Sequence, residues 1–427
     1  MELKPGYEQT EVGVIPEDWK LLPFDSLGTV IDGDRGVNYP SEQEFRDSGY
    51  CLFLNAGNVT KDGFRFNECA FITREKNAQL HKGKLKREDI VLTTRGTVGN
   101  FAYFDSSVPF NNLRINSGMV ILRNESLALL PEFLYALLQS HLVQMQIERL
   151  SFGSAQPQLT VKGIKKFRIT VPPLPEQRSI AEALTHVDAL LGGLDRLIAK
   201  KRDLKQAAMQ QLLTGQIRLP GFHGEWEVKR LGDVIYLIPS GIYGEEKPRL
   251  GLIPSFVVTT THIEENDTWN QKEMPVRFFT PEKLQNYATI TGDLIVVKSS
   301  GSAAKIQSGK IGFIDHERAG TFLFSNFLML LRPTGIMPTF LYFYLCSHNV
   351  KKLLPTLVEA STYPNIRLGD YLDVEIPVPS PAEQTAIAEV LMDIDAELAV
   401  LEQRREKTRD LKQAMMQELL TGRTRLL

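Results

Sequence analysis

The stretch EQRSIAEALTHVDALLGGLDRLIAKKRDLKQAAMQQLLTG (residues 176–215) returns as EQTAIAEVLMDIDAELAVLEQRREKTRDLKQAMMQELLTG (residues 383–422). The second copy follows the first at a constant displacement of 207 residues, without a gap. Prolines cluster before each copy and a Thr-Gly pair ends it, which are typical borders of a helix. Each copy therefore predicts one long helix, about 60 Å in length at roughly 1.5 Å per residue.

Apolar residues in each copy recur at alternating steps of four and three, the spacing of a helix that packs along another helix. The predicted pairing residues are Ile180, Leu184, Val187, Leu191, Leu194 and Ile198 in the first copy, and Ile387, Leu391, Ile394, Leu398 and Leu401 in the second. The stripe continues in steps of four through Leu204, Ala208 and Leu212, and through Leu411, Met415 and Leu419. That change of step predicts a local relaxation of any supercoil. Because a lone helix would leave its seam in water, the two copies are expected to pair with each other.

The same displacement relates residues outside the helices, as a tandem duplication would produce. Trp19 corresponds to Trp226, and Pro131 to Pro338. The sequence therefore predicts a first globular domain, a helix, a second globular domain and a second helix. The predicted boundaries are 1–171, 172–219, 220–377 and 378–427.

The two globular segments mix strand and helix signals. Short apolar runs between Gly, Asn and Asp indicate strands, with 90–93 and 119–122 in the first segment matching 294–298 and 327–332 in the second. Helices are expected at 131–150 and 338–354, and a short amphipathic helix is expected within 19–30. Residues 1–18 read as a loosely ordered arm. The fold class that follows is α+β, with two similar mixed globular domains separated by two long helices.

Composition narrows the functional classes. The formal net charge is −2, but residues 61–170 hold 16 Lys and Arg against 9 Asp and Glu, which allows a basic face on the first globular segment. No apolar run is long enough for a membrane span and no secretory signal is visible. The three cysteines lie far apart in the sequence, as suits a reducing cytoplasm, so a cytoplasmic location is expected.

Catalytic and metal-binding motifs are not found. The sequence has no phosphate-binding G-x-x-x-x-G-K-[ST], no dinucleotide fingerprint, no nucleophile elbow, and no N-P-P-[YF] or D-P-P-Y segment of an amino-methyltransferase. Its seven histidines never stand at metal-ligand spacing. We therefore expect a chain without catalytic residues, metal or cofactor of its own.

Polar and basic loops at equivalent places in the two globular segments remain as candidate binding sites. Gly and Ser permit close backbone approach there, Arg and Lys reach phosphates or guanine edges, and amides address base edges. The candidates are Arg95 and Thr97; Ser154, Gln156 and Gln158; Lys162 and Lys165; Lys298, Ser300, Ser302 and Lys305; and Tyr363 and Asn365. Each alone is more often ordinary surface, and their repetition in both segments favours DNA binding.

The repeated helices, together with the segments TTRGTVG (93–99) and GSAQPQLTVKGIKKF (153–167), closely resemble the specificity subunit of type I restriction–modification systems over the full chain. The resemblance implies two target recognition domains that each read one half of an interrupted, asymmetric double-stranded DNA site. It further implies that the two helices pair antiparallel as a coiled coil and dock two methyltransferase subunits, which restriction subunits join. S-adenosylmethionine would then bind the methyltransferase partner. Gly192 and Gly193 depart from the second copy, which has Ala399 and Val400, and predict either a kink or a close approach of a partner.

Two alternatives stay open at this point. A structural adaptor would use the helices to oligomerise and the globular segments to bind protein, without DNA. The specificity subunit of a system that cleaves on both sides of its site would share the architecture and differ in its partner.

Overall fold

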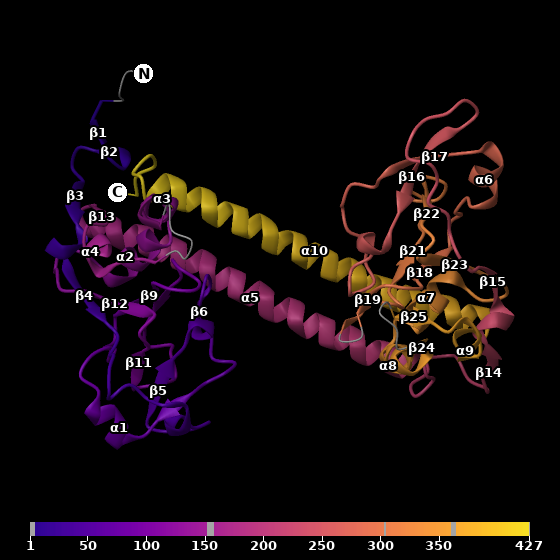
Figure 1. Ribbon diagram of the computed structural model, residues 1–427, viewed down its shortest axis with the longest axis horizontal. Helices are drawn as coiled ribbons and strands as arrows, with labels where there is room; N and C mark the ends of the chain where they lie inside the picture. Colours follow the sequence, from indigo (N-terminus) through magenta and orange to yellow (C-terminus); the bar gives the residue numbers. More distant parts are fainter. Residues whose placement is uncertain (1–4, 152–157, 303–304, 360–363, 427) are drawn as a thin grey trace. The chain divides into compact units, whose positions relative to one another are not determined.

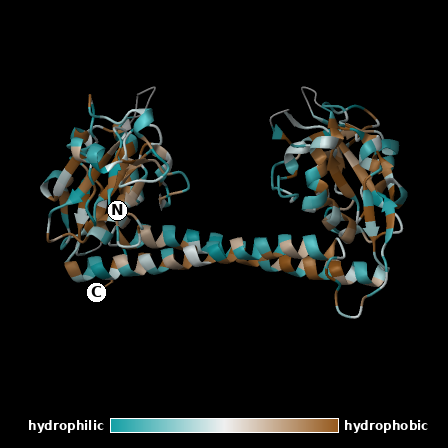
Figure 2. Ribbon diagram, turned by 90° about the horizontal axis from the view of Figure 1, so that it is seen from below, coloured by the Kyte–Doolittle hydropathy of each residue, from teal (hydrophilic) through white to brown (hydrophobic). Residues whose placement is uncertain are grey.

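The computed structural model describes the chain except residues 1–4, 152–157, 303–304, 360–363 and 427. Contacts divide it into two compact units, residues 1–194 with 404–427 (unit 1) and residues 195–403 (unit 2). The division cuts each long helix near its middle, so each unit contains one globular part together with segments of both helices. The protein is α+β, and Figure 2 shows apolar strands inside each globular part.

Unit 1 is built on two small sheets. The four-stranded sheet has the order β10-β9-β12-β4 and is antiparallel, and the three-stranded sheet has the order β11-β5-β8, with β11 parallel to β5. These strands are β4 (Gly28–Asp32), β5 (Cys51–Leu54), β8 (Phe71–Ile72), β9 (Ile90–Thr93), β10 (Phe101–Tyr103), β11 (Leu113–Ile115) and β12 (Met119–Asn124). The other strands are β1 (Tyr7–Thr10), β2 (Gly13–Pro16), β3 (Lys20–Pro23), β6 (Val59–Thr60), β7 (Gly63–Phe64) and β13 (Arg168–Val171), and the short helices are α1 (Arg74–Gln79), α2 (Pro131–Leu138), α3 (His141–Ser151) and α4 (Val161–Ile164).

Unit 2 repeats the topology of these two sheets. Its sheets have the orders β15-β23-β18-β21 and β17-β16-β22, again with one parallel pair, β16 with β22. The strands are β14 (Glu227–Arg230), β15 (Ile235–Ile238), β16 (Ile253–Val258), β17 (Val276–Phe279), β18 (Leu294–Val297), β21 (Ile311–Phe313), β22 (Phe322–Phe324), β23 (Leu328–Pro333) and β26 (Glu375–Val378), with short pairs β19 (Gly301–Ser302) and β20 (Lys305–Ile306), and β24 (Val358–Glu359) and β25 (Asn365–Ile366). Its short helices are α6 (Pro281–Asn286), α7 (Pro338–Cys346), α8 (His348–Leu357) and α9 (Leu368–Leu372).

The long helices α5 (Leu174–Leu212) and α10 (Pro381–Leu419) run antiparallel wherever they meet within a unit (Figure 1). In unit 1, Lys412 of α10 pairs with Asp188 of α5 at 2.6 Å, and in unit 2, Lys205 of α5 pairs with Asp395 of α10 at the same distance. These two ion pairs correspond under the 207-residue displacement with the helices exchanged. Such a reciprocal pattern arises when two copies of one helix pair antiparallel about a two-fold axis.

The predicted pairing residues fall into two groups by burial. Buried members are Ile180, Leu184, Leu194, Ile198, Ile387, Leu391 and Leu398, and half-buried members are Val187, Leu191, Ile394 and Leu401. Leu204 and Leu411 were expected to continue the stripe, but they are 51% and 55% exposed, so the expected stripe is wrong at these two positions. Both leucines lie on the outer surface of their helices, although Ala208, Leu212, Met415 and Leu419 are at least partly buried.

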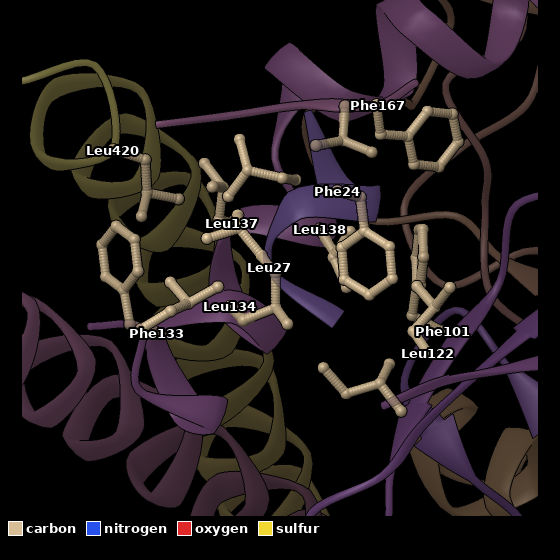
Figure 3. Packing of buried hydrophobic residues seen from close by; sticks show 14 of the residues in the cluster. Phe24, Leu27, Phe101, Leu122, Phe133, Leu134, Leu137, Leu138, Phe167 and Leu420 are labelled. Atoms are coloured by element: carbon tan, nitrogen blue, oxygen red, sulfur yellow. The ribbon is translucent and has the colours of Figure 1, made fainter. Parts of the chain in front are cut away.

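The end of each long helix enters the core of a globular part. Leu419 and Leu420 at the end of α10 belong to the same buried cluster as Ile180 and Leu184 at the start of α5, and Figure 3 shows Leu420 beside Phe133 of α2. Leu212 and Leu213 join the equivalent cluster of unit 2. Each globular part is thus completed by the beginning of one long helix and the end of the other.

A buried carboxylate fixes this arrangement in both units. Arg425, beyond α10, donates to the Glu176 carboxylate of α5 at 2.6 and 2.8 Å, and the indole of Trp19 donates to the same group at 3.0 Å. In unit 2, Arg218 and Trp226 donate to Glu383 of α10 at 2.5, 2.6 and 3.1 Å. Both carboxylates are 1% exposed.

Three sequence expectations for the globular parts are wrong. The expected arm contains the hairpin β1–β2 with Ile15 buried, because that residue reaches the core of unit 1. The expected helix within 19–30 is two strands around a single 3-10 turn at Phe24–Ser26. The expected helices 131–150 and 338–354 are each broken at a serine, since Ser140 turns its hydroxyl back onto the carbonyl of Leu137 and Ser347 adopts an extended backbone before α8. In the part of the chain that the structure describes, no helix is both long and apolar enough to cross a membrane.

Candidate nucleic-acid interface

In unit 1, the loop after β9 meets two other loops at the ends of the sheets. The backbone N–H groups of Thr94 and Arg95 both donate to the carbonyl of Gly118, at 2.8 and 3.2 Å. The backbone N–H of Leu159 donates to the carbonyl of Thr94 at 3.1 Å. Backbone hydrogen bonds therefore hold together three segments that lie far apart in sequence. We call this meeting point of Thr94, Arg95, Gly118 and Leu159 the loop junction of unit 1.

These bonds place two of the predicted DNA-binding residues in contact. With the amide oxygen of Gln158 turned toward Arg95, it accepts from Nη2 at 2.8 Å and from Nε at 3.1 Å. Both side chains are exposed. A guanidinium with an amide beside it can present several donors to base edges or to a phosphate.

Unit 2 forms the same junction with different side chains. Lys298 and Ser299 donate their backbone N–H groups to the carbonyl of Phe327, at 2.9 and 3.3 Å, and Ile366 donates to the carbonyl of Lys298 at 2.9 Å. Asn365 forms a β-bridge with Ser299, so two further predicted residues, Lys298 and Asn365, belong to one junction. The Lys298 ammonium donates to the carbonyl of Pro239 at 3.3 Å.

The remaining predicted residues have the following positions. Ser300 lies in the loop between β18 and β19, where its carbonyl accepts from the hydroxyl of Ser308. Ser302 ends β19, and its hydroxyl accepts from the backbone N–H of Lys305. Lys305 pairs with Glu265 at 2.5 Å, and this hydrogen bond and charge lower the pKa of the Glu265 carboxyl. Thr97 is exposed in the first loop, and its carbonyl accepts from the hydroxyl of Thr93.

Lys162 and Lys165 are exposed on and just after α4, in the segment that follows Leu159. Ser154, Gln156 and Tyr363 lie outside the described residues. Nothing in the structure tests whether any of these residues touches DNA, so their role stays a prediction.

Sequence reasoning missed Phe327, whose exposed side chain lies at the junction of unit 2. The run 327–332 was predicted as a strand, but β23 begins at Leu328, which leaves Phe327 in the loop, where the residue is 52% exposed. The signal was present in the internal repeat, because Gly118 directly precedes β12 as Phe327 directly precedes β23. Aligning the two copies at this strand would have shown glycine opposite phenylalanine at a loop.

The described residues contain no group of three or more His, Cys, Asp and Glu side chains arranged to hold a metal ion. The junctions consist of backbone hydrogen bonds, basic side chains and amides.

The family model for the type I restriction modification DNA specificity domain matches the chain twice, over residues 16–199 and 223–408. The chain belongs to this family of specificity subunits. The two matches correspond to the two copies of the internal repeat, so each copy is one specificity domain.

Curated relatives and solved structures agree with this assignment. The type I restriction enzyme MjaVIII specificity subunit of Methanocaldococcus jannaschii is 26% identical over 96% of the chain and 94% of its own length. The EcoKI specificity subunit of Escherichia coli K12 is 22% identical over 82% of the chain and 76% of its own length. The crystal structure of the S subunit of a type I restriction–modification system from M. genitalium, at 18% identity, covers 98% of each chain with a TM-score of 0.56, which shows the same fold.

Proposed function

We propose that this specificity subunit reads an interrupted, asymmetric DNA site, with one half recognised by unit 1 and the other by unit 2. The supporting observation is the pair of loop junctions, which have the same backbone hydrogen bonds and different side chains. A scaffold held constant around variable side chains is what two readers of different sequences require. Because the halves are read by unlike side chains, the site should not be a palindrome.

The chain would supply recognition and no chemistry. Methylation of adenine with S-adenosylmethionine would take place in two modification subunits docked on the paired helices, and restriction subunits would join the larger complex. We further propose that the helices fix the spacing of the two half-sites, as protein geometry fixes half-site spacing in dimeric repressors.

An exposed helix surface that is the same in both copies supports the docking of two identical partners. The segments RDLKQAAMQQLLTG (202–215) and RDLKQAMMQELLTG (409–422) are nearly identical, whereas DRLIAK (195–200) and EQRREK (402–407) have diverged. The identical pairs that are exposed in both copies are Arg202 and Arg409, Asp203 and Asp410, Leu204 and Leu411, Gln206 and Gln413, Ala207 and Ala414, and Gln210 and Gln417. Exposed residues of this kind are not needed for helix pairing, so their repetition favours one binding surface used twice.

The recognition proposal is tested by co-expressing the chain with its modification subunit and mapping methylated adenines by single-molecule sequencing. An interrupted motif with two unlike halves is expected. A modification subunit that is active with another specificity subunit but leaves DNA unmodified with this one would refute the proposal and favour the structural adaptor. A salt titration of DNA binding adds a second readout, since phosphate contacts predict a steep loss of affinity with salt.

The docking proposal is tested with Leu204→Lys and Leu411→Lys, measured as the mass of the complex by light scattering. Each variant should lose one modification subunit, and the double variant should lose both. Leu190→Lys is the matched control, because Leu190 is a similarly exposed leucine of α5 whose counterpart in the second copy is Glu397. Complexes of unchanged mass in all three variants would place docking elsewhere.

A further inference from the structure

The two junctions differ in which loop supplies the protruding side chain. Thr94 and Arg95 in unit 1 correspond to Lys298 and Ser299 in unit 2, because both pairs directly follow a strand and donate to the same carbonyl. That carbonyl belongs to Gly118 in unit 1 and to Phe327 in unit 2. Unit 1 thus has a long side chain, Arg95, beside a glycine, and unit 2 has a short side chain beside a phenylalanine.

The two protruding groups start from neighbouring positions on the scaffold. A Cβ added to Gly118 would lie 3.8 Å from the Cβ of Arg95. A side chain at position 118 therefore begins next to the loop that carries Arg95. In unit 2, the equivalent backbone hydrogen bonds put Phe327 next to Ser299 in the same way. Where one unit presents a guanidinium, the other presents an aromatic ring.

The ring of Phe327 contributes little to the core of unit 2. Its sequence neighbours Phe322, Phe324 and Leu328 are all buried, whereas Phe327 is 52% exposed. Its backbone carbonyl holds the loop of Lys298, and any residue would provide that carbonyl. The aromatic side chain is thus free to contact a ligand at this surface.

The two chemistries match different base pairs. Arginine donates two hydrogen bonds to the O6 and N7 atoms of guanine, and apolar side chains contact the 5-methyl group of thymine. We propose that Phe327 is a specificity-determining residue of unit 2, which reads a thymine in its half of the DNA site through the 5-methyl group. This inference rests on the proposed function, since it assumes that unit 2 reads one half-site.

The first test is the methylation motif of the complex carrying Phe327→Ala. One position of one half-site should change from thymine to any base, with discrimination lower by about 5- to 150-fold, the range for one mismatched base pair. The other half-site should be unchanged. Phe256→Ala is the matched control, because Phe256 of β16 is 51% exposed in the same unit and lies outside the junction. Melting curves of both variants confirm that folding is intact.

The second test removes the methyl group from the DNA. Deoxyuridine in place of the relevant thymine should weaken binding of the wild-type complex by about fourfold, the value of one buried methyl-sized group, and should leave the Phe327→Ala complex unaffected. A third variant, Arg95→Ser with Gly118→Phe, should change the half-site read by unit 1 and only that half.

The outcomes separate the two proposals. A wild-type complex that modifies no interrupted motif refutes the proposed function and this inference with it. A wild-type motif that Phe327→Ala leaves intact overturns this inference alone. A relaxed position that is not thymine, or is insensitive to deoxyuridine, overturns thymine reading and indicates insertion of the ring between base pairs instead.

Discussion

Removing Arg425 should destabilise unit 1 strongly, because it leaves the Glu176 carboxylate buried without its cation. Glu176 is 1% exposed and accepts two hydrogen bonds from the guanidinium. Breaking a buried ion pair on one side costs about 3–5 kcal/mol. The indole of Trp19 still donates to the carboxylate, so Arg425→Ala should fall near the lower end of that range. The exposed pair of Arg425 with Asp18 adds at most about 1 kcal/mol.

Most of the loss should vanish when the buried charge is removed as well. In the Glu176→Gln background, Arg425→Ala should cost about 1 kcal/mol, the net value of ordinary hydrogen bonds, so the two changes should couple by about 2 kcal/mol or more. Amide hydrogen exchange followed by mass spectrometry suits this test, because a chain of two units need not unfold in one step. Protection of β9 and β12 reports on unit 1, and protection of β18 and β23 reports on unit 2.

The internal repeat supplies the control. Arg218→Ala should reduce protection in β18 and β23, since Arg218 pairs with Glu383 in unit 2. Arg425→Ala should reduce protection in β9 and β12. The reasoning would be refuted if Arg425→Ala cost less than about 1 kcal/mol, or if adding Glu176→Gln restored nothing.

Three further predictions concern single positions. Gly193→Ala should stabilise the chain by about 1 kcal/mol in thermal melts, because α5 is unbroken there and an added Cβ meets no atom within 4 Å. If the variant also binds the modification subunit more weakly, the partner approaches this glycine. Hydrogen bonds from Lys76 and Ser41 lower the pKa of Glu44 from about 4.5 to about 2, so its contribution to stability is complete above pH 4.5 and is lost as the pH falls toward 2. The urea midpoints of the wild type should therefore decline between these pH values more than those of Glu44→Gln. Burial lowers the pKa of Lys310, whose ammonium donates to the carbonyls of Thr260 and Ile263, so just below pH 10.5 the unfolded chain binds more protons than the folded chain. The stability of the wild type should therefore rise with pH there relative to that of Lys310→Met, and parallel curves of stability against pH would contradict this.

Local patterns in the sequence predicted the short buried strands and the long helices. The buried run Ile90–Thr93 is β9 as predicted, and the run predicted at 294–298 is β18 (Leu294–Val297), because short runs rich in β-branched and other apolar residues between turn formers are typical of strands. The long helices were predicted from their heptad spacing and borders. The continuation of the stripe in steps of four failed at Leu204 and Leu411, since periodicity cannot distinguish a stripe that packs on the other helix from one that faces outward.

The contacts that close each unit could not be predicted from the sequence. Arg218 corresponds to Arg425 under the duplication, and Glu176 corresponds to Glu383, so the sequence shows two pairs of equivalent residues. It does not show that each arginine pairs with the carboxylate of the other copy's helix, 165 and 249 residues away. Each arginine meets the glutamate of the other copy because the two helices pair antiparallel. The direction of that pairing cannot be derived from the apolar spacing of the sequence. The junction was likewise predicted only as separate loops, because the hydrogen bond from Leu159 to Thr94 has no local signal.

The distribution of differences between the two copies argues for recognition over a purely structural role. The copies agree where a contact is structural, as at the Trp, Glu and Arg of the buried ion pairs, and they agree again on the exposed surface of the helix ends. They differ at the loop junctions, although the backbone hydrogen bonds there are the same. An adaptor that bound one kind of protein twice would be expected to keep its exposed loops alike. Nearly identical helix ends with unlike loops fit a chain that binds the same partner twice and two different DNA sequences once each.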